Sequence, residues 1–146
     1  MLAADPEVIQ VIREWVQKAE NDLTAAAHVL KLGKRCPTDT VCFHAQQCVE
    51  KYVKALLINH EQDFPKTHNL RVLLALLPAS VWPDLTPEEQ HLLSGYATVT
   101  RYPGDYEAIP LAEARAAVKI ARRVRRQVRK RLPQEALKSS QRFSLR

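Results

Sequence analysis

Polar side chains that can do chemistry gather in one stretch, CFHAQQCVEKYVKALL, at residues 42–57. On a helical wheel of roughly 100° per residue, His44, Gln47 and Lys51 form a column along one border of an apolar arc. Gln46 falls on the other border. A ligand site can use such a histidine for proton transfer. Border residues of this kind equally serve as structural partners of helix ends, loops or a symmetry-related copy, so both interpretations stay open.

The cysteines favour a core role over a metal site. Cys36, Cys42 and Cys48 are an odd number without a C-x-x-C pair, which is typical of reduced thiols. Cys42 and Cys48 fall inside the apolar arc, where a thiol packs as a small hydrophobic group. Cys42 points about 160° away from His44, so zinc ligands do not converge. We therefore expect no metal and no other cofactor.

A second stretch with possible chemistry is RYPGDY, at residues 101–106. The planar guanidinium of Arg101 suits a phosphate and lies next to a Pro-Gly turn. Arg101 can instead bond the carbonyl groups that end a helix, where the helix dipole favours a cation. Tyr102 and Tyr106 either pack against the core or stack on a nucleic-acid base.

Positive charge is concentrated in the last quarter of the chain. Residues 1–112 hold 10 Lys and Arg against 14 Asp and Glu, whereas residues 113–146 hold 12 against 2. The last predicted helix presents a basic face on the side opposite its apolar residues. This face comprises Arg115, Lys119, Arg122, Arg123, Arg126 and Lys130. Nucleic acid, an acidic protein surface and simple solvation are three explanations of such a face.

Apolar spacing and capping signals predict five helices and no strand. We expect them at residues 6–32, capped by Asp5, at 39–59, capped by Thr38 or Asp39, at 68–77, capped by Thr67, at 87–100, opened by a Thr86–Glu89 capping box, and at 110–132. The expected fold class is all-α, an antiparallel bundle of four long helices and one short helix. One domain covers residues 1–132, and residues 133–146 form a polar tail.

No apolar run reaches the roughly 20 residues of a membrane span, and residues 1–10 lack the features of a signal peptide. We therefore expect a cytoplasmic protein without membrane contact.

Four stretches, taken in order, resemble the HEPN domain in its bacterial and archaeal form. They are AENDLTAA, CFHAQQCVEKYVKALL, PKTHNL and RYPGDY. The resemblance covers about residues 15–128, and the ordered set is much more specific than any single stretch. Similar domains are helical bundles that usually form two-fold dimers, and many are encoded beside a minimal nucleotidyltransferase as toxin–antitoxin pairs. The resemblance thus implies a homodimer and a nucleotidyltransferase partner.

The resemblance also implies an activity and its residues. Where HEPN domains are active, they cleave RNA without a metal, using an Arg followed, after a spacer of roughly four to six residues, by a His. Here Arg101 matches the Arg, but Tyr106 stands in the place of the His, so the ribonuclease motif is incomplete. Tyrosine, with a pKa of about 10, is a poor base near neutral pH. His44 is the nearby alternative for proton transfer, and Tyr106 is the candidate for modification with AMP by the partner.

Two functions follow from these features. The first is a HEPN protein that binds nucleotide or RNA through His44, Gln47, Lys51, Arg101 and Tyr102, as the toxin-type partner of a nucleotidyltransferase. The second is a non-catalytic homodimeric interaction module that docks a partner protein on the basic face of its last helix.

Overall fold

The computed structural model describes residues 5–98 and 107–138, and over these ranges all of its regular structure is helical. The α-helices are α1 (Pro6–Leu30), α2 (Thr38–Asn59), α3 (Leu70–Ala75), α4 (Pro87–Thr98), α5 (Leu111–Arg129) and α6 (Gln134–Leu137), with 3₁₀ turns η1 (Gly33–Arg35) and η2 (Ala79–Val81). The predicted all-α class is therefore confirmed.

Helix α1 begins as the sequence predicted. The Asp5 side chain accepts a hydrogen bond from the backbone N–H of Glu7 at 2.8 Å, and Pro6 occupies the first helical position. Its buried apolar residues are Ile9, Ile12, Val16, Ala19 and Ala26. Asp22 is the one charged residue in this buried stripe, where it lies between Ala19 and Ala26.

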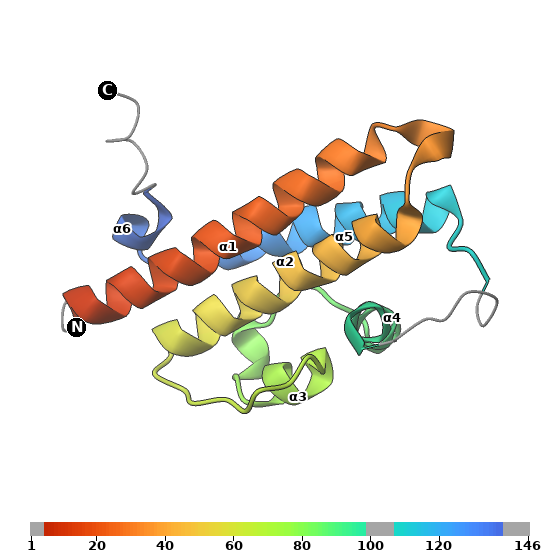
Figure 1. Ribbon diagram of the computed structural model, residues 1–146. Coiled ribbons are helices and arrows are strands. Elements are labelled where there is room, and N and C mark those ends of the chain that lie inside the picture. Colours follow the sequence, from red (N-terminus) through yellow and green to blue (C-terminus); the bar gives the residue numbers. More distant parts are fainter. Residues whose placement is uncertain (1–4, 99–106, 139–146) are drawn as a thin grey trace, which may run out of the picture.

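Helix α2 is the central element, since it contacts α1, α3, α4 and α5 (Figure 1). It begins directly after Pro37 and has no side-chain cap, so the predicted caps at Thr38 and Asp39 are wrong. The Thr38 hydroxyl instead donates to the backbone carbonyl of Ile109 at 2.7 Å. This bond ties the start of α2 to the chain just before α5.

Helices α2 and α5 run in the same direction, and both run opposite to α1 (Figure 1). Their starts meet at the Thr38–Ile109 bond. Their ends meet where the Asn59 side chain donates to the backbone carbonyl of Arg131 at 3.3 Å. The segment with α3 and α4 carries the chain back along α2 before α5 begins, which permits this parallel pairing. The predicted antiparallel arrangement is therefore correct for α1 against α2 but wrong for α2 against α5.

The short helix α3 is shorter than residues 68–77, and the predicted cap at Thr67 is wrong. Asn69 is the cap, because its side-chain oxygen accepts from the N–H groups of Arg71 and Val72 at 3.0 and 3.4 Å. Thr67 accepts from the N–H of Asn69 at 3.1 Å and so shapes the turn before the helix. His68 consequently lies in this turn and not in the helix.

The start of α4 carries the predicted capping box. The N–H of Thr86 donates to the Glu89 carboxylate at 3.0 Å, and the N–H of Glu89 donates to the Thr86 hydroxyl at 3.1 Å.

Beyond Pro133, the chain forms α6 where a polar tail was expected. Ala136 is buried, and Arg13 of α1 donates to the carbonyl of Glu135 at 2.6 Å. Helix α5 ends at Arg129, before the predicted end at residue 132, and Pro133 is the N-cap residue of α6.

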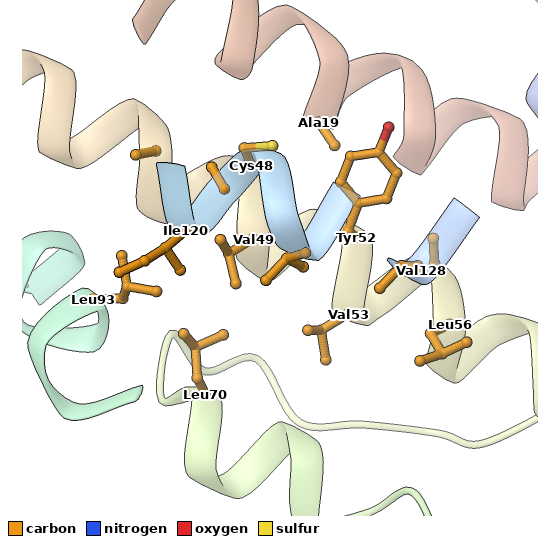
Figure 2. Packing of buried hydrophobic residues seen from close by; sticks show 14 of the residues in the cluster. Ala19, Cys48, Val49, Tyr52, Val53, Leu56, Leu70, Leu93, Ile120 and Val128 are labelled. Atoms are coloured by element: carbon orange, nitrogen blue, oxygen red, sulfur yellow. The ribbon is translucent and has the colours of Figure 1, made fainter. Parts of the chain in front are cut away.

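The core lies on α2 and gathers side chains from every neighbouring helix. Figure 2 shows Leu56 of α2 near Val128, Val49 and Val53 of α2 on the side of Leu70, and the ring of Tyr52 beside Ala19 of α1. Cys42 and Cys48 are fully buried, as expected for small core residues. Over the described ranges, no helix has the length and apolar character that a membrane crossing requires.

Replacing Leu56 with Ala should lower the free energy of unfolding by about 2–5 kcal/mol, because the side chain is fully buried and leaves a cavity. The matched control is Leu92→Ala in α4, where the leucine is 40% exposed and the loss should stay below about 1 kcal/mol. Urea unfolding curves measure both. Equal losses would contradict the described core.

Candidate functional site

A buried carboxylate on α1 organises the histidine side of α2. Asp22 is 8% exposed. One of its oxygens lies 2.8 Å from Nδ1 of His44, and the other lies 2.5 Å from Nζ of Lys51. His44 and Lys51 are seven residues apart, or two helical turns, so Asp22 fits between them. We call these three residues the α2 edge.

The contact with Asp22 determines which nitrogen of His44 is free. An ionised carboxylate only accepts hydrogen bonds, so Nδ1 of His44 donates to it. In the neutral ring, Nε2 is then the unprotonated nitrogen. The His44 side chain is 31% exposed. This arrangement, a carboxylate that orients a partly exposed imidazole, is the one that general bases use.

Gln47 does not join the other two members of the predicted column. Its amide donates to the side-chain oxygen of Gln46 at 2.6 Å, and Gln46 donates to Glu50 at 2.8 Å. Gln46 is fully buried, so its predicted place on the opposite border is wrong. The two adjacent glutamines therefore form a hydrogen-bonded chain that leads into the core.

This chain ends at Glu50, a carboxylate that is 2% exposed. Glu50 also accepts from Lys54 at 2.8 Å and contacts Nδ1 of His68 at 2.8 Å. Burial acts to raise the pKa of Glu50, but the hydrogen bonds from Lys54, His68 and Gln46 outweigh it and hold the pKa below its ordinary value. His68 thus joins the loop before α3 to α2.

A third carboxylate, Glu20, connects α1 to α5. Arg125 donates to both of its oxygens, at 2.7 and 3.0 Å, and the Tyr52 hydroxyl donates at 2.5 Å. Arg129 in turn donates to the Tyr52 oxygen at 3.2 Å. Burial acts to raise the pKa of Glu20. The hydrogen bonds from Arg125 and Tyr52 lower it by more than burial raises it, so the pKa lies below its ordinary value. Burial and this carboxylate raise the pKa of Tyr52.

The sequence pattern of the HEPN domain matches residues 12–131 of the chain. This range holds all three carboxylate clusters. The chain belongs to the HEPN domain family. Among curated proteins, no sequence matches it.

Two solved structures are similar to this HEPN domain. TT1696 from Thermus thermophilus is 30% identical, with a TM-score of 0.67 over 84% of this chain and 99% of its own. ST0689, described as an archaeal HEPN homologue, is 26% identical, with a TM-score of 0.61 over 82% of this chain and 96% of its own. Their near-complete coverage indicates that the helical bundle is the shared unit.

Three of the expected HEPN site residues, Arg101, Tyr102 and Tyr106, lie outside the described residues. Three residues after Tyr106, the carbonyl of Ile109 accepts a hydrogen bond from Thr38, which precedes His44 by less than two turns of α2. Of the described residues, no group of three or more His, Cys, Asp and Glu side chains is arranged to hold a metal ion.

The basic face of α5 divides into paired and unpaired residues. Arg123 donates to Glu89 of α4 at 2.8 Å and so leaves the predicted face. The remaining members are exposed: Arg115, Lys119, Arg122, Arg126 and Lys130.

Sequence reasoning missed the acidic partners Asp22, Glu20 and Glu50. Asp22 follows Ala19 by three residues and precedes Ala26 by four, the same spacing that identified the apolar stripe. Glu50 lies four residues after Gln46 and four before Lys54, so all three share one side of α2. A charged residue that falls at the spacing of the buried apolar residues was therefore the feature of the sequence that could have identified these partners.

Asp22→Asn should lower the free energy of unfolding by about 1–3 kcal/mol, since the amide cannot balance Lys51 or accept from both partners. Asp63→Asn, at an exposed position, should leave stability within about 0.5 kcal/mol of the parent. Urea unfolding measures both, and a neutral Asp22→Asn would show that the cluster contributes no stability.

The lowered pKa of Glu50 predicts acid sensitivity with a definite sign. A carboxyl with a lower pKa in the folded state stabilises it above the unfolded pKa of about 4.3, and this contribution disappears as pH falls through the folded pKa. Glu50→Gln should therefore lose stability at neutral pH and lose less on acidification than the parent. Denaturant unfolding between neutral pH and acid tests this. Glu88→Gln, an exposed control, should keep the parental pH dependence, and an unchanged dependence in Glu50→Gln would refute the assignment.

Proposed function

We propose that this HEPN domain binds RNA or a nucleotide at the α2 edge, and that it is the toxin-type partner of a nucleotidyltransferase. The observation that carries the proposal is the 2.8 Å contact between Asp22 and Nδ1 of His44. It leaves Nε2 of a partly exposed ring free to accept a proton, beside the cationic Lys51.

An exposed aromatic ring next to His44 supports the same proposal. Phe43 is 40% exposed, and its ring meets the imidazole edge to face with centroids 5.4 Å apart. An aromatic face at the surface can stack on a base of any identity. Phe43 thus adds a base contact beside the α2 edge, which itself offers a proton acceptor at His44 and, two turns further along α2, a cation at Lys51.

If the bound RNA is cleaved, the α2 edge supports attack by the substrate's own 2′-hydroxyl. Nε2 of His44 takes the hydroxyl proton, the 2′-oxygen bonds to phosphorus, and the bond to the 5′-oxygen breaks. The products are a 2′,3′-cyclic phosphate and a 5′-hydroxyl that takes its proton from water. In this proposal Arg101 stabilises the negative charge on the phosphate.

The proposed partnership adds a means of control. Transfer of AMP from ATP to the Tyr106 hydroxyl releases pyrophosphate and places a bulky anionic group five residues from Arg101. The modified chain should no longer bind RNA through Arg101.

His44→Ala and Arg101→Ala should each weaken binding of short RNA and of ATP by at least about tenfold, since each removes a direct contact with the ligand. Titration calorimetry measures the affinities, and growth arrest on expression reports toxicity. His91→Ala, which replaces an exposed histidine of α4, is the matched control and should change neither readout.

The second candidate is a non-catalytic homodimeric module, and the exposed Phe43 favours it as well, because an aromatic ring suits a dimer seam. Pull-down with a nucleotidyltransferase encoded beside this chain separates the two. Capture of that protein together with no binding of nucleotide or RNA would contradict the binding site and support the module.

A further inference from the structure

The exposed side of α5 carries a row of cations that have no ion-pair partner among residues 5–98 and 107–138. Its members are Arg115, Lys119, Arg122, Arg126 and Lys130, which we call the α5 stripe. Successive members are three or four residues apart, so they follow one line along the helix. At 1.5 Å per residue this line is about 22 Å long.

The neighbouring arginines of α5 differ from the stripe, because they have ion-pair partners. Arg123 and Arg125 lie on opposite sides of it, roughly 60° and 100° from its midline on the helical wheel. They pair with Glu89 of α4 and Glu20 of α1, respectively. The fold thus neutralises the arginines that face its neighbouring helices, whereas no ion pair or hydrogen bond within the described residues engages the side chains of the stripe.

No acidic side chain on α5 offsets this charge. Glu113 is the only carboxylate of the helix, and it lies on the other side, where it accepts a hydrogen bond from the Tyr96 hydroxyl. The stripe is therefore a continuous positive field, which attracts a polyanion.

We propose that the α5 stripe binds the phosphate backbone of single-stranded RNA, independently of sequence and separately from the α2 edge. The proposal rests on the proposed function only in its choice of RNA as the polyanion. A polynucleotide presents one phosphate on every nucleotide, so a line of evenly spaced cations meets several phosphates at once.

Two observations favour a polynucleotide over other anionic partners. The large exposed apolar side chains of the described residues are Val11, Leu32, Phe43, Val72 and Leu92, and none lies on α5. A protein interface needs an apolar centre, which α5 does not expose, and it is depleted of lysine, whereas the stripe contains Lys119 and Lys130. A membrane-binding helix inserts its apolar face, but that face of α5 is buried in the bundle.

Fluorescence anisotropy with labelled single-stranded RNA of mixed sequence tests the proposal. Arg122→Gln combined with Arg126→Gln should weaken binding about tenfold or more at low salt and reduce the slope of log affinity against log salt by about 1.4, since each phosphate contact contributes about 0.7. Lys66→Gln combined with Arg71→Gln removes the same charge from exposed positions on the α3 side and should retain parental affinity.

The contrary outcomes are distinct. Unchanged affinity and slope in the Arg122/Arg126 variant would overturn the proposal. Displacement of RNA by poly-glutamate at equal charge concentration would overturn it in favour of an acidic protein partner. Absence of RNA binding by the parent would also overturn it, whereas calorimetry with ATP at the α2 edge tests the proposed function by itself. Far-ultraviolet circular dichroism verifies that each variant is folded.

Discussion

The architecture depends on burying three polar side chains of α2, the helix that contacts α1, α3, α4 and α5. Helix α2 carries Gln46, Glu50 and Lys54 in positions that are no more than 8% exposed, so the bundle has to satisfy charges as well as cover apolar surface. An unpaired buried charge costs several kcal/mol, roughly the net stability of a small domain. The carboxylates of Asp22, Glu20 and Glu50 remove this cost because each has at least two hydrogen-bond partners.

These contacts also set how the helices are placed. An apolar stripe can slide or rotate with little penalty, whereas Asp22 accepts from His44 and Lys51 only in one register of α1 against α2. Arg125 similarly aligns α5 with α1 through two bonds to Glu20. Lys54 is held by Glu50, and its Nζ lies 5.5 and 5.7 Å from the ring centroids of Trp15 and Phe64. The apolar residues supply most of the cohesion, and the carboxylates select the arrangement.

The sequence predicted the helices well because their signals are local. Proline, the Asp5 cap, the Thr86–Glu89 box and apolar spacing act within a few residues. Predictions that depended on tertiary contacts fared differently. Thr38 bonds the chain before α5 in place of capping α2, and residues 134–137 form a helix because α1 offers a surface to pack on.

In the candidate site, too, the sequence predicted what depends on one helix and missed what depends on contacts between helices. A helical wheel identified His44 and Lys51 as neighbours, but it cannot show that both bind Asp22, which belongs to another helix. It also grouped Gln47 with them, since a wheel contains no information on the buried Glu50 chain that holds the glutamines. The HEPN resemblance covered the right part of the chain, and the family match confirms it. Arg101, Tyr102 and Tyr106 stay predictions because they lie outside the described residues.

The central claim is that Asp22 orients His44 so that Nε2 is the free nitrogen. Long-range ¹H–¹⁵N correlation spectra of the imidazole, recorded well above the usual titration range of histidine, report the tautomer directly. His44 should show a protonated Nδ1 and an unprotonated Nε2, and Asp22→Asn should abolish this preference. A protonated Nε2 in the parent protein would contradict the account.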